Sequence, residues 1–210
     1  MITAARFWDK IADKYARQPV KNLAAYEQTL DRTRAYLDKT SRVLEIGCGT
    51  GATALKLAGD AGSITATDIT PAMIGIARGR LEDSGIENVG FVCCDATAPD
   101  FAKGSFDAVT AFNLLHLLPD AEATVERAYE LLTPGGYFIS KTACLREMSP
   151  LWRPAIAVMQ LIGYAPYVRR LRASDVDGMI EAAGFEIQEG RTFTGSRGSW
   201  FVVGRKPFSA

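Results

Sequence analysis

The sequence predicts an α/β fold with a seven-stranded, mostly parallel sheet and helices on both faces. Short apolar segments alternate with segments of helical periodicity from residue 43 to residue 139, and one junction is a glycine-rich turn from strand to helix. The chain then ends in two strands, Phe185 to Arg191 and Ser199 to Val203, joined by a turn rich in Gly, Ser and Arg. We expect these two strands to form an antiparallel hairpin.

The length and composition fit a single soluble globular domain over residues 1–210. Hydrophobic residues make up 48% of the chain and charged residues 23%, which suits a protein with a sizeable core. Lys+Arg and Asp+Glu number 24 each, so no global positive field favours nucleic acid as a partner. The N-terminus lacks an apolar signal core, and no apolar run approaches the ~20 residues of a membrane span. We therefore expect a cytoplasmic protein.

The cysteines and the histidine show no pattern typical of a metal site. The cysteines lack Cys-x-x-Cys spacing and the chain has one histidine, so no metal is expected. The four cysteines are predicted to be reduced and mostly buried thiols: Cys48, Cys93, Cys94 and Cys144.

Two amphipathic helices are predicted before the first strand, as an N-terminal helical cap over residues 1–40. Apolar residues from Ala4 to Tyr15 recur at helical spacing, and Pro19 follows as a stop. The second helix is expected to reach about Lys39. Its predicted inward face consists of Leu23, Tyr26, Leu30, Thr33 and Leu37. The cap either packs against the sheet or covers a bound ligand.

The stretch from Val43 to Gly51 is predicted to be a buried strand followed by a ligand-binding loop. Its first residues are mostly apolar, three glycines then occur at every second position, and a helix begins at Ala52. Without Cβ atoms the loop can turn tightly, and a ligand can approach main-chain N–H groups near the positive end of the helix. The loop residues expected to hold the ligand are Gly47, Cys48, Gly49 and Gly51.

The loop motif has two interpretations. Gly47-x-Gly49-x-x-Ala52 fits the dinucleotide fingerprint. Glu45-x-Gly47-x-Gly49-x-Gly51 resembles motif I of the class I S-adenosylmethionine-dependent methyltransferases, in which the acidic residue braces the loop or its ligand. The resemblance implies a Rossmann-like sheet and S-adenosyl-L-methionine as cofactor, with S-adenosyl-L-homocysteine as product.

The end of the second predicted strand, residues 64–68, supports the resemblance. Asp68 lies near the ~20-residue offset at which a strand-end carboxylate can accept hydrogen bonds from both ribose hydroxyls. Thr70 is expected to cap the next helix. The segment is similar to motif II and its sequel, in which Ile69 and Met73 would flank the adenine. Met73 is equally suited to plain core packing.

The third strand, residues 89–93, is followed by Asp95 and Ala96, which resemble motif III. In the family these positions would contact the adenine amino group and a ring nitrogen. An acidic residue after a strand is also often a cap or a turn residue. Three carboxylates, those of Glu45, Asp68 and Asp95, are thus expected along one edge of the sheet.

The N-terminal segment resembles that of small-molecule members of the family. The pattern Phe7-Trp8-x-x-Ile11-Ala12-x-x-Tyr15 occurs in such enzymes, where the tyrosine can approach the cofactor carboxylate. Tyr15 is therefore predicted to bind the cofactor, with a purely structural place in the helical cap as the alternative.

The fourth strand, residues 106–112, opens with a Phe-Asp pair typical of the family. Asn113, directly after the strand, is predicted at the cofactor, and His116 at the face where the methyl group would project. His116 is the candidate general base, or else a structural loop residue. No Asn-Pro-Pro-Tyr or Asp-Pro-Pro-Tyr follows this strand, which disfavours nucleic-acid bases and protein glutamine as acceptors.

A helix from Glu122 to Leu132 is predicted to lead through Thr133-Pro134-Gly135-Gly136 into the fifth strand. Pro134 is expected to stop the helix, and the paired glycines to allow a positive φ before the chain re-enters the sheet. The last helix is expected to begin with a capping box of Ser174 and Asp177.

Residues 144–172 are too long for an ordinary connection, and the resemblance implies a helical lid over the acceptor there. The middle of this segment is almost wholly apolar, but it is too short to span a bilayer. Peripheral membrane contact through residues 151–172, a dimer interface or a core helix with a basic end are the alternatives. The residues expected to contact the acceptor are Trp152, Tyr164 and Arg169, together with His116.

The resemblance is strongest from Val43 to Ile139 and implies methyl transfer to a small-molecule or lipid-like acceptor with an apolar part. A nicotinamide-dependent oxidoreductase would use the same glycine loop and Asp68, but should also carry a catalytic pair such as Tyr-x-x-x-Lys, and we expect no such pair in this chain. A non-catalytic S-adenosylmethionine-binding sensor is the third class, because the specific motifs all concern the donor. We expect a monomer or a homodimer.

Overall fold

The computed structural model describes residues 4–97, 100–147, 167–196 and 198–208. The strands are β1 (Arg42–Ile46), β2 (Ser63–Asp68), β3 (Val89–Cys93), β4 (Phe106–Phe112), β5 (Leu132–Ala143), β6 (Glu186–Arg191) and β7 (Ser199–Arg205). The α-helices are α1 (Ala4–Ala16), α2 (Leu23–Arg34), α3 (Ala52–Leu57), α4 (Pro71–Ser84), α5 (Ala121–Leu131) and α7 (Ala173–Ala182). Three short 3-10 helices are η1 (Ala58–Asp60), η2 (Leu115–Leu117) and η3 (Leu145–Glu147).

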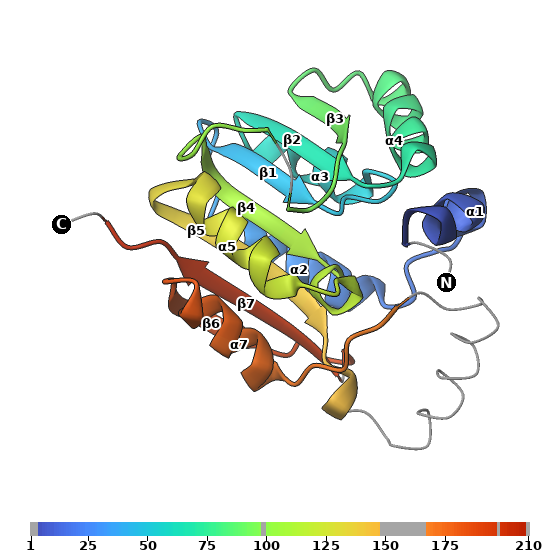
Figure 1. Ribbon diagram of the computed structural model, residues 1–210. Coiled ribbons are helices and arrows are strands. Elements are labelled where there is room, and N and C mark those ends of the chain that lie inside the picture. The colour runs from blue at the N-terminus through green and yellow to red at the C-terminus, as the bar shows by residue number, and fades with distance from the viewer. Residues whose placement is uncertain (1–3, 98–99, 148–166, 197, 209–210) are drawn as a thin grey trace.

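The strands form one sheet in the order β3-β2-β1-β4-β5-β7-β6 (Figure 1). The five strands from β3 to β5 are parallel, whereas β7 runs antiparallel to both of its neighbours, β5 and β6. The predicted fold is confirmed: seven strands, mostly parallel, with an antiparallel C-terminal strand. The carboxyl ends of β1, β2 and β4 therefore meet at one edge, where ligands of such sheets bind.

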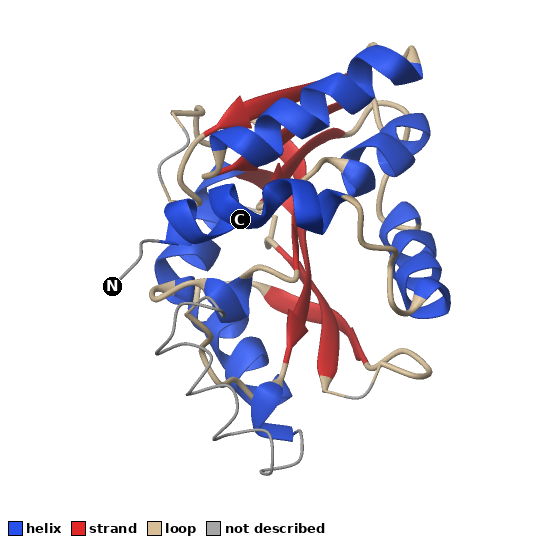
Figure 2. Ribbon diagram, turned by 90° about the vertical axis from the view of Figure 1, so that its right-hand side faces the viewer, coloured by secondary structure: helices blue, strands red, loops and turns tan. Residues whose placement is uncertain are grey.

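Helices cover both faces of the sheet (Figures 1 and 2). On one face, α2, α3 and α4 pack on β1 to β3 in a cluster that includes Leu30, Ile74 and Phe91. On the other face, α5 and α7 pack on β4, β5 and β7 around Val125 and Phe138. Burial on both faces explains why the central strands are almost continuously apolar. The helix α1 contacts α4 at the rim of the sheet.

The second helix is shorter than predicted. It ends at Arg34 rather than near Lys39, because Asp38 folds the following segment into a turn and accepts a hydrogen bond from the N–H of Thr40 at 2.8 Å. Leu23, predicted on the buried face, is 58% exposed.

The capping box predicted for the last helix is wrong. The helix begins at Ala173, and the carboxylate of Asp175 accepts a hydrogen bond from the N–H of Arg172 at 2.8 Å. Asp177 instead accepts a hydrogen bond from the indole N–H of Trp200 at 2.7 Å. The carboxylate that was expected to cap the helix is therefore hydrogen-bonded to Trp200 on β7 instead.

The turn into β5 differs in one respect from the prediction. The helix α5 ends at Leu131, before Pro134 is reached, and β5 begins at Leu132. Leu132 pairs with Phe106 of β4, and after a register shift Tyr137 pairs with Ala108. Gly135 has the expected positive φ, of 82°. The four cysteines are free, but Cys93, at the end of an edge strand, is exposed rather than buried.

Within the described ranges, no helix has the length and apolar character that crossing a membrane requires. Only the two ends of the predicted lid belong to these ranges, so Trp152 and Tyr164 lie outside the described residues.

Candidate functional site

The loop between β1 and α3 is built from glycines with positive φ angles. Gly47, Gly49 and Gly51 have φ values of 70°, 54° and 74°, a region that side chains disfavour. A Cβ on Gly47 would lie 2.7 Å from Leu114 Cδ1, and one on Gly51 would lie 2.6 Å from Phe91 Cζ. Backbone conformation therefore favours glycine at all three positions, and lack of space adds to this at Gly47 and Gly51.

Asp68, at the end of β2, holds this loop in place. Its Oδ2 accepts a hydrogen bond from the N–H of Gly49 at 2.9 Å, and its Oδ1 accepts one from the N–H of Thr70 at 2.9 Å. The N–H of Cys48 donates to the carbonyl of Thr67 at 2.8 Å. Each carboxylate oxygen can accept a further hydrogen bond, so Asp68 can serve loop and ligand together.

Glu45 lies beneath the loop and is 3% exposed. The backbone N–H of Ala54 donates a hydrogen bond to its carboxyl group, while Oε2 is buried without a partner among the described residues. Burial raises the pKa of Glu45 to about 8, with a smaller contribution from the nearby charge of Asp68. The buried carboxyl group thus links the end of β1 to the start of α3.

The helix α1 closes one side of the loop. A Cβ built on Gly49 would lie 3.9 Å from Cε1 of Tyr15, and Tyr15 itself packs edge-to-face against Trp8. Tyr15 is 46% exposed, so its ring borders the loop and remains open to a ligand.

Arg80 of α4 joins α1 to the loop, and sequence analysis did not identify it. Its Nη1 donates to the carbonyl and hydroxyl oxygens of Thr50 at 3.0 and 2.7 Å, and its Nη2 donates to the carbonyl of Ala16 at 3.1 Å. An arginine on an amphipathic helix looks like an ordinary surface residue, so no local signal could have marked it.

The residues predicted around the adenine differ in their environments. Ile69 is 39% exposed, whereas Met73 is 2% exposed and packs in the core. Asp95 is exposed, and its Oδ1 accepts hydrogen bonds from the N–H and hydroxyl of Thr97 at 2.9 and 2.8 Å, which makes it a turn residue. Ala96 is half-buried beside it.

The end of β4 carries a strained residue and the histidine. Asn113 has a φ of 55°, the one positive φ at a non-glycine position in the described part of the chain, and its N–H donates to the carbonyl of Lys141 at 2.6 Å. His116 lies in η2, and burial lowers its pKa to about 4. Its Nδ1 is buried and has no partner among the described residues.

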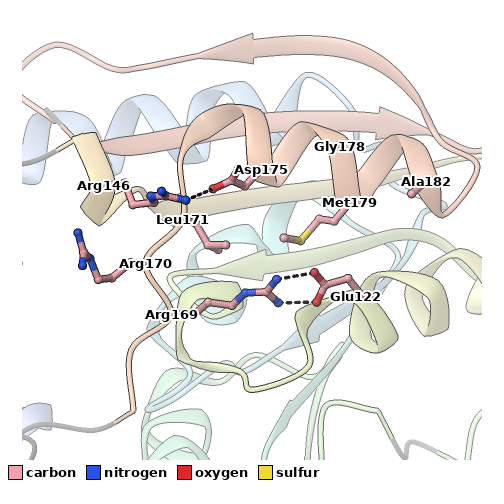
Figure 3. Close-up of a pocket in the computed structure, with 9 residues that line it drawn as sticks. All are labelled: Glu122, Arg146, Arg169, Arg170, Leu171, Asp175, Gly178, Met179 and Ala182. Carbon is pink, nitrogen blue, oxygen red and sulfur yellow. Dashed lines mark hydrogen bonds and ion pairs between the residues drawn. The ribbon is translucent and has the colours of Figure 1, made fainter.

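Arg169 forms a two-bond ion pair with Glu122 instead of presenting a free cation (Figure 3). Its backbone N–H donates to the carbonyl of His116 at 2.7 Å, and this hydrogen bond holds the end of the predicted lid against η2. A cavity of about 550 Å³ lies beside this pair, at the start of α7. Its lining includes no residue of the glycine loop, so this cavity is separate from the predicted cofactor site.

Residues 43–136 match the family described as methyltransferase domain. A ubiquinone biosynthesis O-methyltransferase of Aromatoleum aromaticum is 30% identical over 193 residues, which cover 89% of this chain and 80% of that protein. The chain belongs to the class I S-adenosylmethionine-dependent methyltransferases. The aklanonic acid methyltransferase DauC of a Streptomyces species is 30% identical over 168 residues, or 69% of this chain and 74% of that protein.

The fold of this methyltransferase also matches solved structures. The crystal structure of the cyclase SpnF superimposes with a TM-score of 0.81 and covers 99% of this chain and 97% of its own, at 19% sequence identity. At that identity the likeness concerns the fold alone. It supports the Rossmann-like sheet of the methyltransferase and says nothing of its acceptor.

The methyltransferase also carries the spacing Tyr-x-x-x-Lys, in Tyr137 and Lys141. Both residues lie on β5, where four residues span about 13 Å. On a helix the same spacing would bring the two side chains together on one face. The pair therefore does not form the catalytic dyad that an oxidoreductase would need.

Proposed function

We propose that this enzyme transfers the methyl group of S-adenosyl-L-methionine to a hydroxyl oxygen of a small-molecule or lipid-like acceptor with an apolar part. The relatives named above support this proposal, since one is an O-methyltransferase of ubiquinone biosynthesis and another acts on aklanonic acid. The observation that carries the proposal is the convergence of the glycine loop and Asp68 at the edge of the sheet where Asn113 and His116 follow β4.

The geometry fits the cofactor. The main-chain N–H groups of the loop and the buried Glu45 would hold the methionine part, with Tyr15 and Asn113 beside it. Asp68 would accept hydrogen bonds from the ribose hydroxyls while keeping its bond to Gly49. The groups expected around the adenine are Ile69, Asp95 and Ala96, with Met73 packed behind them in the core.

When bound, the cofactor supplies an electrophilic methyl group on a sulfonium, and its displacement releases a neutral thioether. The protein's main task is to hold the acceptor oxygen ~3 Å from the methyl carbon and in line with the sulfur, which contributes several kcal/mol. His116 is neutral at pH 7 because burial lowers its pKa to about 4, so its Nδ1, which has no partner among the described residues, can accept the hydroxyl proton. The hydrogen bond from Arg169 to the His116 carbonyl would keep the imidazole in position.

Calorimetry separates this function from the alternatives. We expect S-adenosyl-L-methionine and S-adenosyl-L-homocysteine to bind, and NADH and NADPH to show no binding. Binding of a nicotinamide cofactor in their place would favour an oxidoreductase. A methyl-transfer screen with quinols, phenols, amines, fatty acids and phospholipids then tests the acceptor class. Transfer to amines alone would overturn the oxygen acceptor, and cofactor binding without any transfer would favour a sensor.

A further inference from the structure

Lys141 is a partly buried lysine that forms no ion pair with a carboxylate of the described residues. Its Nζ donates to the carbonyl of Ala25 at 3.3 Å and to the hydroxyl of Thr29 at 2.9 Å, both on α2. No ion pair to Lys141 occurs within the described ranges of the chain. An ammonium group has three donors, and the two recorded acceptors are uncharged.

An ammonium group without a counterion among the described residues is a costly way to connect α2 to β5. Burial lowers the pKa of Lys141, which means that its surroundings disfavour the charge. Buried charges are usually offset by a charge of opposite sign. A neutral donor would connect α2 to β5 at a lower cost in desolvation, so the retained cation points to an anion that the described part of the chain does not supply.

The place of Lys141 in the sheet puts this cation at the acceptor side of the site. Lys141 pairs with Phe112, the last residue of β4, and its carbonyl accepts the hydrogen bond from Asn113. Two residues later β5 ends at the same edge of the sheet as β4. The backbone of Lys141 therefore lies beside the end of the strand that leads to His116, and its side chain reaches from there to α2.

An aromatic cluster borders the ammonium group of Lys141. Its Nζ lies 5.7 Å from the ring centroid of Phe193, which follows β6. Phe193 belongs to a cluster that also contacts Phe112 and Tyr137. A cation at the border of an aromatic cluster suits a ligand that joins an anionic group to an aromatic ring.

We infer that Lys141 forms the subsite for an oxyanion of the methyl acceptor, a carboxylate or phenolate carried on an aromatic body. This inference rests on the proposed function, because it places the group within the acceptor site of the methyltransferase. Arg169, which was expected to contact the acceptor, is less suited to bind this anion, since Glu122 already neutralises that arginine.

Two probes of nearly equal size and different charge test the subsite. Calorimetry on the full chain saturated with S-adenosyl-L-homocysteine compares 4-hydroxybenzoate with the uncharged 4-hydroxybenzamide. The unmodified protein should bind the carboxylate about tenfold more tightly than the amide. Lys141→Met and Lys141→Gln should remove this preference, and Lys141→Arg should keep most of it. Lys103→Met is the matched control, because Lys103 is an exposed lysine that pairs with Glu130. This variant should keep the full preference for the carboxylate.

The affinity for S-adenosyl-L-homocysteine separates the two proposals. Unchanged affinity in Lys141→Met shows that the variant is folded, so a preference that persists there would overturn the subsite. Equal binding of the two probes to the unmodified protein, or binding of neither, would overturn it as well. Failure of the unmodified protein to bind S-adenosyl-L-homocysteine would instead overturn the proposed function.

Discussion

The carboxylate of Asp68 accepts a hydrogen bond from the N–H of Gly49 at 2.9 Å, so the end of β2 holds the loop that follows β1. Removing this group should weaken cofactor binding, because the loop loses its anchor and the ribose loses its acceptor. Hydrogen bonds to charged groups contribute roughly 1.5–3 kcal/mol, so Asp68→Ala should bind S-adenosyl-L-homocysteine about 10- to 100-fold more weakly by calorimetry. Asp83→Ala, at an exposed position of α4, should bind normally. Equal affinity in Asp68→Ala and the unmodified enzyme would refute the cofactor site.

Arg80 connects the glycine loop to the end of α1, so Arg80→Met should release that helix. We expect faster hydrogen exchange of the α1 amides and several-fold weaker binding of S-adenosyl-L-homocysteine. Arg78→Met is the matched control on the same helix, because Arg78 donates to the carbonyl of Phe91 on β3 and contacts neither partner of Arg80. Identical exchange of the α1 amides in the two variants would show that Arg80 does not hold α1.

Three glycine substitutions separate backbone strain from lack of space. Gly51→Ala combines a positive φ with a Cβ 2.6 Å from Phe91 Cζ and should destabilise the fold by more than about 2 kcal/mol. Gly85→Ala has a positive φ but open surroundings and should cost about 1 kcal/mol. Gly79→Ala, inside α4 with open surroundings, should add about 0.5–1 kcal/mol of stability. Urea denaturation gives the three values, and the proposed order fails if Gly51→Ala costs no more than Gly85→Ala.

Glu45 should make the stability of the ligand-free protein depend on pH. Its pKa is raised to about 8 in the folded state, so the folded protein holds a proton that the unfolded chain releases at its ordinary pKa. Between these two pKa values the free energy of unfolding should fall as pH rises, by on the order of a few kcal/mol. Urea denaturation at about pH 5.5, 7 and 8.5 measures this slope. Glu45→Gln should flatten it, and an equally steep slope in that variant would assign the effect to other groups.

His116 should act in turnover without contributing to cofactor affinity. A positioned general base contributes about 10²- to 10⁴-fold, so His116→Ala should lower turnover by at least about 10²-fold with an acceptor found in the screen. Binding of S-adenosyl-L-homocysteine should be nearly unchanged. Because burial lowers the pKa of His116 to about 4, the imidazole stays neutral and turnover should show no histidine-type decrease between about pH 8 and pH 5.5. Unaltered turnover in His116→Ala would reject the role.

Local patterns in the sequence predicted most of the elements and the cofactor loop. Periodicity of 2.0 and 3.6 residues is a property of neighbouring residues, so strands such as Phe106–Phe112 could be read without knowing their partners. The need for glycine at position 51 was also visible locally, because a tight strand-to-helix turn demands a positive φ.

The tertiary structure decided which distant groups meet. Pairing of β5 with β7 rather than β6, the bond from Trp200 to Asp177 and the ion pair of Arg169 with Glu122 join residues far apart in the chain. A long polar side chain has many possible partners, and its choice depends on packing of elements that no local pattern encodes. The sequence by itself therefore determined the fold class and predicted the donor site, whereas only the folded chain placed Arg80 on the loop and left Lys141 without a counterion among the described residues.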